Sequence, residues 1–424
     1  MTASALETDY FSDKAVLLDP YEYFEELRTH GPVAQLQSRD MVAVTGFPEA
    51  VEVLVNKADF SSVINPDPVA PLRFVPEGDD ISAQIEATMG TGPMDLMVSY
   101  DGDMHANARS LLNPLFVPSR LKANEAFMHD YADNMIREMV AKGGCEAISE
   151  VATPYVTMVI ADLLGVPADD REAFRKLIDA GPPPGNMDAA DEAQSSHPLM
   201  VMAGYFMRYM SERLAAPQDD LLTELAGAKY PDGSEVPLME AVKNAMFLFA
   251  AGQDTSAKLI GNSLRFICEN PELQAELRAD RSKIGPFLEE VLRLEGSTKT
   301  TFRLAKRNTR IGDFEIPAGK KIVIFVAAAN RDPRRWDDPK QFRIDRPKIK
   351  EHLAFGRGAH VCAGAPLARK EVAVLYDRLF EHTSDIRLSE AHHGPKGARR
   401  IDYEPSYIIR GLENLHVEFT PSQG

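Results

Sequence analysis

Cysteine is scarce in this chain, whose 424 residues contain only Cys145, Cys268 and Cys362. Their odd number and wide spacing predict no disulfide framework, and free thiols suit a reducing compartment. No apolar run reaches the ~18 residues of a membrane-spanning helix. The N-terminal sequence MTASALETDYFSDKAVLLDP has neither the charged start nor the apolar centre of a signal peptide. We therefore expect a soluble, cytoplasmic protein that does not associate with a membrane.

Positive charge is also in deficit, since the formal net charge is −17. Nucleic acid and anionic lipid are poor partners for the surface as a whole, because both repel an acidic protein. This balance does not exclude a local basic patch. The apolar fraction of 44% and the charged fraction of 26% are those of an ordinary globular protein. Length alone would suggest two or three domains.

The pattern along the chain is mostly helical. Residues 21–30 and most of 103–270 have helical periodicity, with a break at 181–196 where proline and glycine cannot continue a helix. The longest predicted helix runs from Pro237 to about Asn270 and is closed by the proline that follows. Short β-like runs occupy 33–45, 311–326 and the tail after 399. We expect a mainly α (α+β) fold, a helix-rich body with small peripheral β-sheets.

The most informative segment is FGRGAHVCAG, from Phe355 to Gly364. Three glycines around one cysteine suit a backbone that turns tightly and approaches a flat ligand. The next residues, APLARK, open a helix with Pro366 near its first turn. Cys362 therefore precedes a helix N-terminus, where free N–H groups and the helix dipole favour a thiolate, and Phe355 can shield the sulfur from water.

Two simpler interpretations of this segment compete with a reactive thiolate. An isolated cysteine is most often a small, buried and unreactive side chain, but the ten-residue pattern around Cys362 reverses that preference. A zinc site is disfavoured, because no second cysteine lies within ligand spacing.

The segment resembles the cysteine loop of the cytochrome P450 family, and four further motifs in the expected order extend the resemblance from about residue 101 to 369. The resemblance implies haem b with Cys362 as the sulfur ligand to iron, a ligand that favours O–O cleavage. It also implies one P450 domain over residues 1–424. Its β-rich portion would lie at about 30–60 and 298–330, and its helical haem-binding body at about 100–295 and 352–385.

The segment AAGQDT, Ala250–Thr255, lies in the middle of the longest predicted helix. A glycine inside a helix costs about 1 kcal/mol relative to alanine and needs a reason; small residues such as Ala251 let the backbone approach a bulky cofactor. A mid-helix threonine can bond a carbonyl one turn earlier and bend the helix. Taken alone, Asp254 and Thr255 would be a surface acid and a helical alcohol. The resemblance implies that they deliver protons for O–O cleavage.

Glu290 and Arg293, in EEVLR, lie at i and i+3 on one helix face. An exposed pair of this kind would stabilise the helix by only ~0.2–0.5 kcal/mol. The resemblance implies instead a buried structural pair that is joined by Arg346 from a later loop.

The resemblance also implies a set of donors for the two haem propionates. His105 and Arg109 lie one turn apart in DGDMHANAR, Arg303 lies in TTFRLAKR, and His360 precedes Cys362 by two residues. Singly, each would more often be a solvated surface residue. The predicted cofactor-binding residues are His105, Arg109, Ala251, Arg303, Phe355, His360, Cys362 and Gly364.

The substrate is the least defined part of the prediction. Residues 62–100 form a long stretch without a sustained period, and such stretches in compact proteins are usually functional. Several methionines lie in this stretch, in the 181–196 break and in its flank: Met89, Met94, Met97, Met187, Met200, Met202 and Met207. Methionine adapts to apolar ligands of varied shape, although a methionine at helical spacing is more often an ordinary core residue. We expect a mid-sized apolar substrate, such as a terpenoid, steroid, aromatic or fatty compound, without identifying it or the carbon attacked.

Two local departures from the family pattern concern the pocket. Ala363 follows the cysteine where many relatives carry leucine, and LEGSTKTTF follows Arg293 where relatives commonly carry a Pro-Pro-Val type of stretch. Ser297 and Thr298 would then either place hydroxyls in the pocket or only satisfy local backbone groups.

The resemblance implies a monooxygenase that hydroxylates a C–H bond with O2, two electrons and two protons. No flavin domain or cysteine cluster is attached, so NAD(P)H would act indirectly, through a ferredoxin reductase and an acidic ferredoxin. The docking cations would be Arg109, Arg334, Arg335, Arg357 and Lys370. A peroxide-driven peroxygenase is one alternative, against which the acid–alcohol pair argues. A haem-based sensor or carrier is another, and no signalling or DNA-binding appendage supports it.

Overall fold

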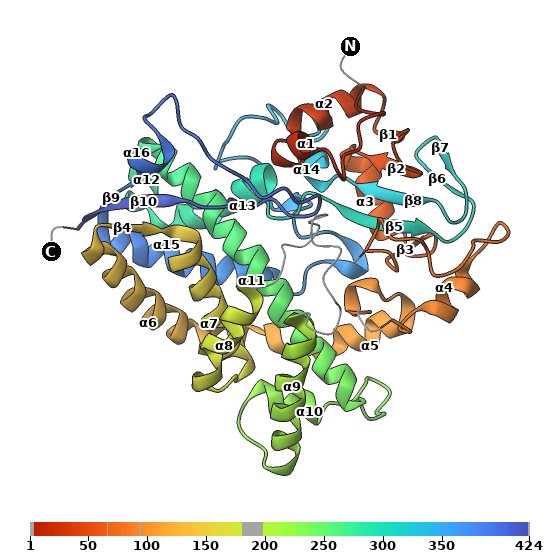
Figure 1. The fold of residues 1–424 in the computed structure, drawn as a ribbon, viewed down its shortest axis with the longest axis horizontal. Coiled ribbons are helices and arrows are strands. Elements are labelled where there is room, and N and C mark those ends of the chain that lie inside the picture. Colours follow the sequence, from red (N-terminus) through yellow and green to blue (C-terminus); the bar gives the residue numbers. More distant parts are fainter. Residues whose placement is uncertain (1–3, 66, 93–94, 180–197, 423–424) are drawn as a thin grey trace.

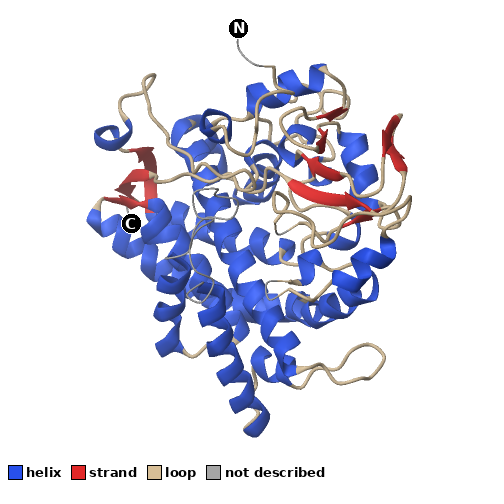
Figure 2. Cartoon of the chain, turned by 45° about the vertical axis from the view of Figure 1, so that its right-hand side comes forward, coloured by secondary structure: helices blue, strands red, loops and turns tan. Residues whose placement is uncertain are grey.

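The computed structural model describes residues 4–65, 67–92, 95–179 and 198–422 (Figure 1). Helices dominate this part of the chain, and the strands form small separate groups at opposite sides of the helical body (Figure 2). This arrangement confirms the predicted mainly α fold with small sheets. The predicted break at 181–196 lies outside the described residues.

The largest sheet has five strands in the order β1-β2-β8-β5-β3. β2 and β8 pair in parallel with Met41 opposite Lys321, and the other pairs are antiparallel. Apolar runs such as MVAV and KIVI place Val42, Val44 and Ile322 in a buried cluster under this sheet. The strands are β1 (Val33–Gln35), β2 (Met41–Val44), β3 (Phe60–Ser61), β5 (Thr301–Ala305) and β8 (Lys321–Ile324).

Two smaller sheets complete the β structure. β10 lies between β4 and β9 in a three-stranded antiparallel sheet, and β6 pairs with β7 in a hairpin. The predicted β-like tail after 399 is a regular strand only at its end. These strands are β4 (Gly144–Glu146), β6 (Thr309–Ile311), β7 (Phe314–Ile316), β9 (Thr383–Leu388) and β10 (His416–Pro421).

Helix α11, Leu238–Glu269, runs diagonally through the middle of the protein (Figure 1). Its 32 residues correspond to about 48 Å at 1.5 Å per residue. Pro237 and Asn270 are its cap residues, so the predicted helix is correct to within one residue at each end. α7 (Thr153–Leu164) and α9 (Pro198–Ala215) pack against α11, which buries most of its length.

Helix α15, Ala365–His382, begins directly after the cysteine loop and packs against α6 (Pro118–Lys142) and α13 (Ile284–Glu295). Gly364 is its N-cap residue and a proline occupies its first turn, as predicted. The remaining α-helices are α1 (Lys14–Leu18), α2 (Tyr21–Thr29), α3 (Phe47–Val55), α4 (Ser82–Thr88), α5 (Gly102–Leu112), α8 (Ala168–Asp179), α10 (Leu221–Ala226), α12 (Pro271–Ala279), α14 (Val326–Ala329) and α16 (Glu390–His393).

The stretch at 62–100 is less irregular than its sequence suggests. It contains helix α4 and a 3-10 turn at Met97–Ser99. Ile85, 1% exposed, anchors α4 to the core, and seven residues are too few for helical periodicity to stand out in a sequence. Among the described helices, none combines the length and the hydropathy needed to cross a membrane.

Candidate functional site

A single cavity borders all eight residues predicted to bind the cofactor, together with Thr255. They come from five separate elements or loops: α5, α11, β5, the cysteine loop and the start of α15. The fold therefore brings together residues that lie more than two hundred positions apart in the sequence. The eight are His105, Arg109, Ala251, Arg303, Phe355, His360, Cys362 and Gly364.

The cysteine loop is shaped by two glycines in the left-handed region. Gly356 has φ +67° and Gly358 has φ +74°, and a Cβ on Gly358 would lie 2.6 Å from the Leu54 carbonyl oxygen of α3. A side chain at that position would therefore displace α3 or the loop. The Cys362 N–H donates to the Phe355 carbonyl oxygen at 2.8 Å, which closes the loop.

Two opposing effects act on the Cys362 thiol. Burial raises its pKa above the ordinary value, while backbone N–H groups of Gly364 and Ala365 and the Arg109 guanidinium act to lower it. The two N–H donors belong to the first turn of α15, where no carbonyl of the helix can accept from them. The sulfur therefore lies where a negative charge is stabilised by donors rather than by a neighbouring base.

Four basic side chains, His105, Arg109, Arg303 and His360, border the same cavity and have few acid partners among the described residues. The His105 and His360 rings stack with centroids 4.0 Å apart, and the buried Nε2 of His105 has no hydrogen-bond partner in the described part of the chain. Arg303 is 4% exposed. In the described part of the chain, its side chain donates one hydrogen bond, to the Phe302 carbonyl oxygen at 2.7 Å. Arg109 donates to the Val361 carbonyl oxygen at 2.6 Å.

Burying a cation without a counter-ion costs free energy, so burial lowers the pKa values of these basic side chains. Burial lowers the pKa of His105 and His360, and it lowers that of Arg303 to about 10. Neither Arg109 nor Arg303 forms an ion pair with a described residue, and His360 has only Asp101 at 4.0 Å. This part of the cavity is therefore suited to a ligand that carries carboxylates.

Helix α11 also borders the cavity. Thr255 Oγ1 donates to the Ala251 carbonyl oxygen at 2.8 Å, the predicted bond to the preceding turn. Both residues border the cavity. A Cβ on Gly252 would lie 2.7 Å from Ile160 Cδ1, so this glycine also serves the close packing of α7 on α11.

Asp254 is next to Thr255 in the sequence but is not part of the cavity wall. It lies on the other side of α11, where Lys258 Nζ is 3.7 Å from its Oδ1. Burial raises the pKa of Asp254, and Lys258 acts in the opposite direction. The two residues of the predicted acid–alcohol pair thus face different surroundings.

Ser297 both satisfies a backbone group and borders the cavity. Its hydroxyl donates to the Thr255 carbonyl oxygen at 2.7 Å, so it satisfies backbone, while the residue still borders the cavity beside Thr298. This bond ties the segment after α13 to the middle of α11.

Of the predicted methionines whose side chains are described, Met97 borders the cavity, together with apolar residues such as Phe247 and Leu248. Met202 is fully buried in the core instead, and Met89 accepts a hydrogen bond from the Asp101 N–H. Met94 and Met187 lie outside the described residues, as does the side chain of Met200.

Glu371 was missed in the sequence. It lies on α15, is 1% exposed and borders the cavity, and its Oε2 has no hydrogen-bond partner among the described residues. Burial raises its pKa to about 8, and a hydrogen bond with Ser256 opposes this rise. The signal was available, because Leu367, Glu371 and Leu375 recur at i, i+4 and i+8 on the buried face of one helix.

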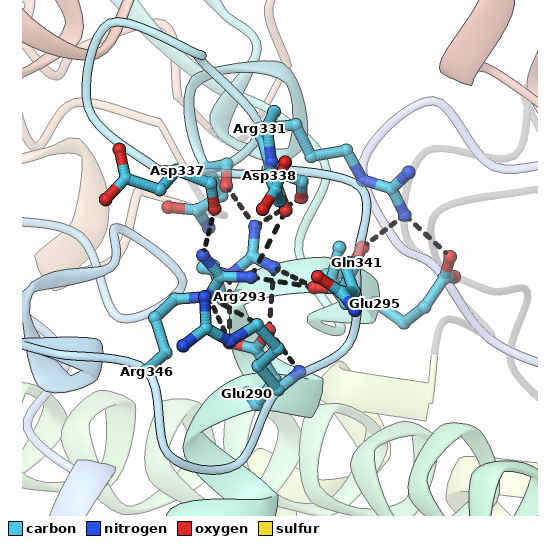
Figure 3. Close-up of polar contacts among 12 residues, drawn as sticks. Glu290, Arg293, Glu295, Arg331, Asp337, Asp338, Gln341 and Arg346 are labelled. Atoms are coloured by element: carbon cyan, nitrogen blue, oxygen red, sulfur yellow. Dashed lines mark hydrogen bonds and ion pairs between the residues drawn. The ribbon is translucent and has the colours of Figure 1, made fainter.

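The predicted framework of ion pairs is present (Figure 3). Glu290 accepts from Arg293 Nη2 at 2.7 Å and Nε at 2.9 Å, and from Arg346 Nε at 3.1 Å. The side chains of all three are at most 2% exposed. Spare guanidinium donors bond loop carbonyls, including that of Gln341 (Figure 3), so the pair is internal as predicted.

Most of the predicted docking cations already have partners. Arg335 pairs with Glu351 at 2.6 Å, and Arg357 donates to the Glu351 carbonyl oxygen at 2.8 Å. Arg334 pairs with both Glu49 and Asp332, and Lys370 pairs with Glu125.

A model of the cytochrome P450 family matches residues 199–384. The chain is 30% identical to the cytochrome P450 monooxygenase PikC of Streptomyces venezuelae, over 95% of this chain and 91% of that protein. Substrate-free CYP150A6 of Mycobacterium marinum has a TM-score of 0.92 and 44% identity, over 99% of this chain and 100% of that one. The chain belongs to the cytochrome P450 family. It is a P450 monooxygenase with bacterial relatives, and the cofactor of its family is haem.

A more distant P450 structure contains a steroid. CYP109E1 of Bacillus megaterium in complex with corticosterone has a TM-score of 0.79 and 26% identity, over 95% of this chain and 99% of that one.

Proposed function

We propose that this P450 hydroxylates a mid-sized apolar compound, with haem b held through Cys362. The observation that carries the proposal is the shared cavity, which is bordered by a cysteine at a helix N-terminus, by apolar residues of α11, and by basic side chains of which only His360 has an acid partner among the described residues, Asp101 at 4.0 Å. When bound, haem supplies the activation of O2 and the transfer of one oxygen atom to the substrate.

The residues present fit haem b. Cys362 would be the iron ligand, and the N–H groups that start α15 stabilise its thiolate. The unpartnered Nε2 of His105 and the guanidiniums of Arg109 and Arg303 would bind the propionates, with His360 beside them. Ala251 offers a small side chain on α11, and Phe355 limits water near the sulfur.

Thr255 and Asp254 would handle the protons. The Thr255 hydroxyl donates to the Ala251 carbonyl oxygen, so its oxygen is free to accept a hydrogen bond from water in the cavity. Asp254 lies behind the same turn, and a quarter of its side-chain surface is accessible. It would pass protons through water toward Thr255.

The substrate chamber supports an apolar compound with few polar groups. Its walls include Ile160, Leu163 and Phe247, and Met97 can adapt to varied shapes. Thr298 offers a hydroxyl. The steroid in the CYP109E1 complex is of the size and polarity that we propose, which supports this substrate class without singling out steroids.

We further propose that a separate ferredoxin and ferredoxin reductase supply electrons from NAD(P)H. The basic residues around the cysteine loop, Arg109, Arg334, Arg335, Arg357 and Lys370, would meet an acidic ferredoxin. The three cysteines are free thiols, which supports a cytoplasmic location. We also propose that residues 1–424 form one P450 domain.

The test is a spectral screen of purified, haem-loaded protein against apolar compounds. Steroids, terpenoids, aromatics and fatty acids should include ligands that shift the iron from low to high spin, and the best of them should be hydroxylated with a surrogate ferredoxin chain. A protein that no compound shifts, or whose product forms equally fast with hydrogen peroxide alone, would contradict the proposal, and the second result would favour a peroxygenase.

A further inference from the structure

Lys258 is a buried charged residue in the middle of α11 that the proposed function does not use. It lies one turn after Asp254, and only 7% of its side-chain surface is accessible. Its Nζ is 3.7 Å from Asp254 Oδ1 and donates a hydrogen bond to Glu404 Oε1, 146 residues later in the chain. The lysine therefore connects the acid of α11 to a carboxylate of the segment that leads to β10.

The C-terminal segment is shaped to receive this lysine. Tyr403 and Leu412 form an isolated antiparallel bridge, and the Glu404 N–H donates to the Gly411 carbonyl oxygen at 3.0 Å. A Cβ on Gly411 would lie 2.1 Å from Lys258 Cδ and under 3.0 Å from its Cγ and Cε. Three side-chain carbons of Lys258 thus occupy the space that a side chain at position 411 would need. Glycine at this position therefore allows the lysine to pack against the C-terminal segment.

Two carboxyls share this one ammonium group. Asp254 Oδ2 and Glu404 Oε2 are both buried without a hydrogen-bond partner in the described part of the chain. Burial raises the pKa of both acids and Lys258 opposes this, while Asp254 and Glu413 also act to raise that of Glu404. Among the described residues, the charged groups at this cluster are Lys258, Asp254, Glu404 and Glu413. With one cation between two acids, a buried proton is favoured on one of them.

We propose that Lys258 and Glu404 are positioning residues for Asp254: they hold its carboxyl on the outer side of α11 and set the pH range over which it delivers protons. This inference rests on the proposed role of Asp254. Lys258 divides its charge between two carboxyls, so Glu404 withdraws part of the electrostatic stabilisation that Asp254 would otherwise receive.

The two partners must then act on Asp254 in opposite directions. Glu404→Gln leaves Lys258 to Asp254 alone, which stabilises the aspartate and lowers its pKa. Lys258→Met keeps the length of the stem beside Gly411 but removes the cation, which raises that pKa. A shift of about one unit each way is the size expected for a charge at this distance. A purely structural contact would give shifts of one sign, or none.

The experiment uses the haem-loaded full chain and follows the protonated carboxyl band of Asp254 by infrared titration, identified by its loss in Asp254→Asn. The same variants are assayed for product per NAD(P)H against pH, with the compound that gives the largest spin shift in the ligand screen. Lys243→Met is the control, because Lys243 pairs with Glu240 on the same helix and should leave the titration unchanged.

We expect the infrared midpoint and the pH limb of the coupling profile to move down in Glu404→Gln and up in Lys258→Met. If Asp254→Asn abolishes the limb but neither partner variant moves the midpoint, this inference fails and the proposed role of Asp254 stands. If Asp254→Asn leaves the limb unchanged, the proposed role itself fails. Should Lys258→Met not fold, an unshifted Glu404→Gln midpoint is enough to overturn the inference.

Discussion

Thr255 and Asp254 are neighbours in the sequence, yet only the threonine borders the cavity. Thr255→Ala should therefore still consume NAD(P)H and O2 with its redox chain, but release more peroxide and less product, since the hydroxyl that orders water in the cavity is gone. Asp254→Asn should instead slow turnover by ~10²–10⁴-fold, the usual contribution of one positioned proton donor. Product, peroxide and NAD(P)H are measured together.

Thr157→Ala is a matched control for this pair, because Thr157 makes the same bond to the preceding turn, to the Thr153 carbonyl oxygen at 2.8 Å, away from the cavity wall. It should keep wild-type coupling. Unchanged coupling in Thr255→Ala, together with an unchanged rate in Asp254→Asn, would remove both residues from the mechanism.

The buried carboxyl of Glu371 should make the stability of the folded protein depend on pH. Its pKa rises from an ordinary 4.5 to about 8 in the folded protein, so between these values the native state holds a proton that the unfolded chain releases. Stability that depends on this proton is therefore lost as pH rises from about 5 to 8. Glu371→Gln keeps the neutral shape, and its melting temperature should exceed that of the wild type by more at pH 8.5 than at pH 5.

Thermal unfolding of the haem-loaded proteins across this pH range measures the difference. Glu138→Gln serves as the control, because that glutamate is exposed on α6 and its ion pair in the described part of the chain is with Lys142. A Glu371→Gln increment that is constant with pH, or that shrinks as pH rises, would show that Glu371 is ionised in the fold.

The ends of α11 and the start of α15 could be predicted from the local sequence. Prolines and glycines mark where α11 begins and ends and where α15 begins, because proline cannot continue a helix. Both ends of α11 and the start of α15 were predicted to within a residue. The loop FGRGAHVCAG is contiguous, so its place before α15 was predictable as well. The internal position of Glu290 was predictable only through the family resemblance.

Other features depend on packing between distant segments. Consecutive side chains of a helix point about 100° apart, so Asp254 and Thr255 could not be expected to share one face. The sequence alone does not show that Asp254 meets Glu404 of the C-terminal segment through Lys258. Short α4 carries too few turns for a periodic signal, and the unpartnered carboxyl of Glu371 becomes visible only when α15 meets α11. The sequence therefore predicted which residues line the cavity better than it predicted the orientation of their side chains.

The Glu290 framework joins α13 to the loop before the cysteine segment, and its loss should be severe. Glu290→Ala leaves Arg293 and Arg346 buried without a carboxylate, which costs about 3–5 kcal/mol. We expect little stable haem incorporation, measured as haem per protein after purification. Glu276→Ala breaks the surface pair with Lys283 and should cost only ~0–1 kcal/mol. A soluble, fully haem-loaded Glu290→Ala protein would contradict the framework role.

The protein as a whole is acidic, with a net charge of −17, so the docking face that we propose for ferredoxin would have to be a local basic patch. Arg335→Glu and Arg357→Glu should each slow the first electron transfer and leave substrate affinity intact, because both reverse a charge beside the cysteine loop. Stopped-flow reduction at two ionic strengths measures this, and the wild-type rate should fall steeply with salt.

Arg335 also lies over the Trp336 ring at 4.2 Å, so the stability of that variant must be measured alongside. Arg387→Glu is the control, because Arg387 lies on β9, beyond the far end of α15, about 27 Å along an 18-residue helix. Equal reduction rates for all four proteins, with no salt dependence, would place the docking face elsewhere.

The proposed ligation of the haem iron by Cys362 can be tested with one spectrum. The reduced carbon monoxide adduct of the wild-type protein should show the far red-shifted Soret band that thiolate ligation gives, and Cys362→His should lose that band. Cys145→Ser is the control, because that thiol lies on β4 away from the cavity, and it should keep the band. A Cys362→His protein that retains the red-shifted band would show that another residue ligates the iron.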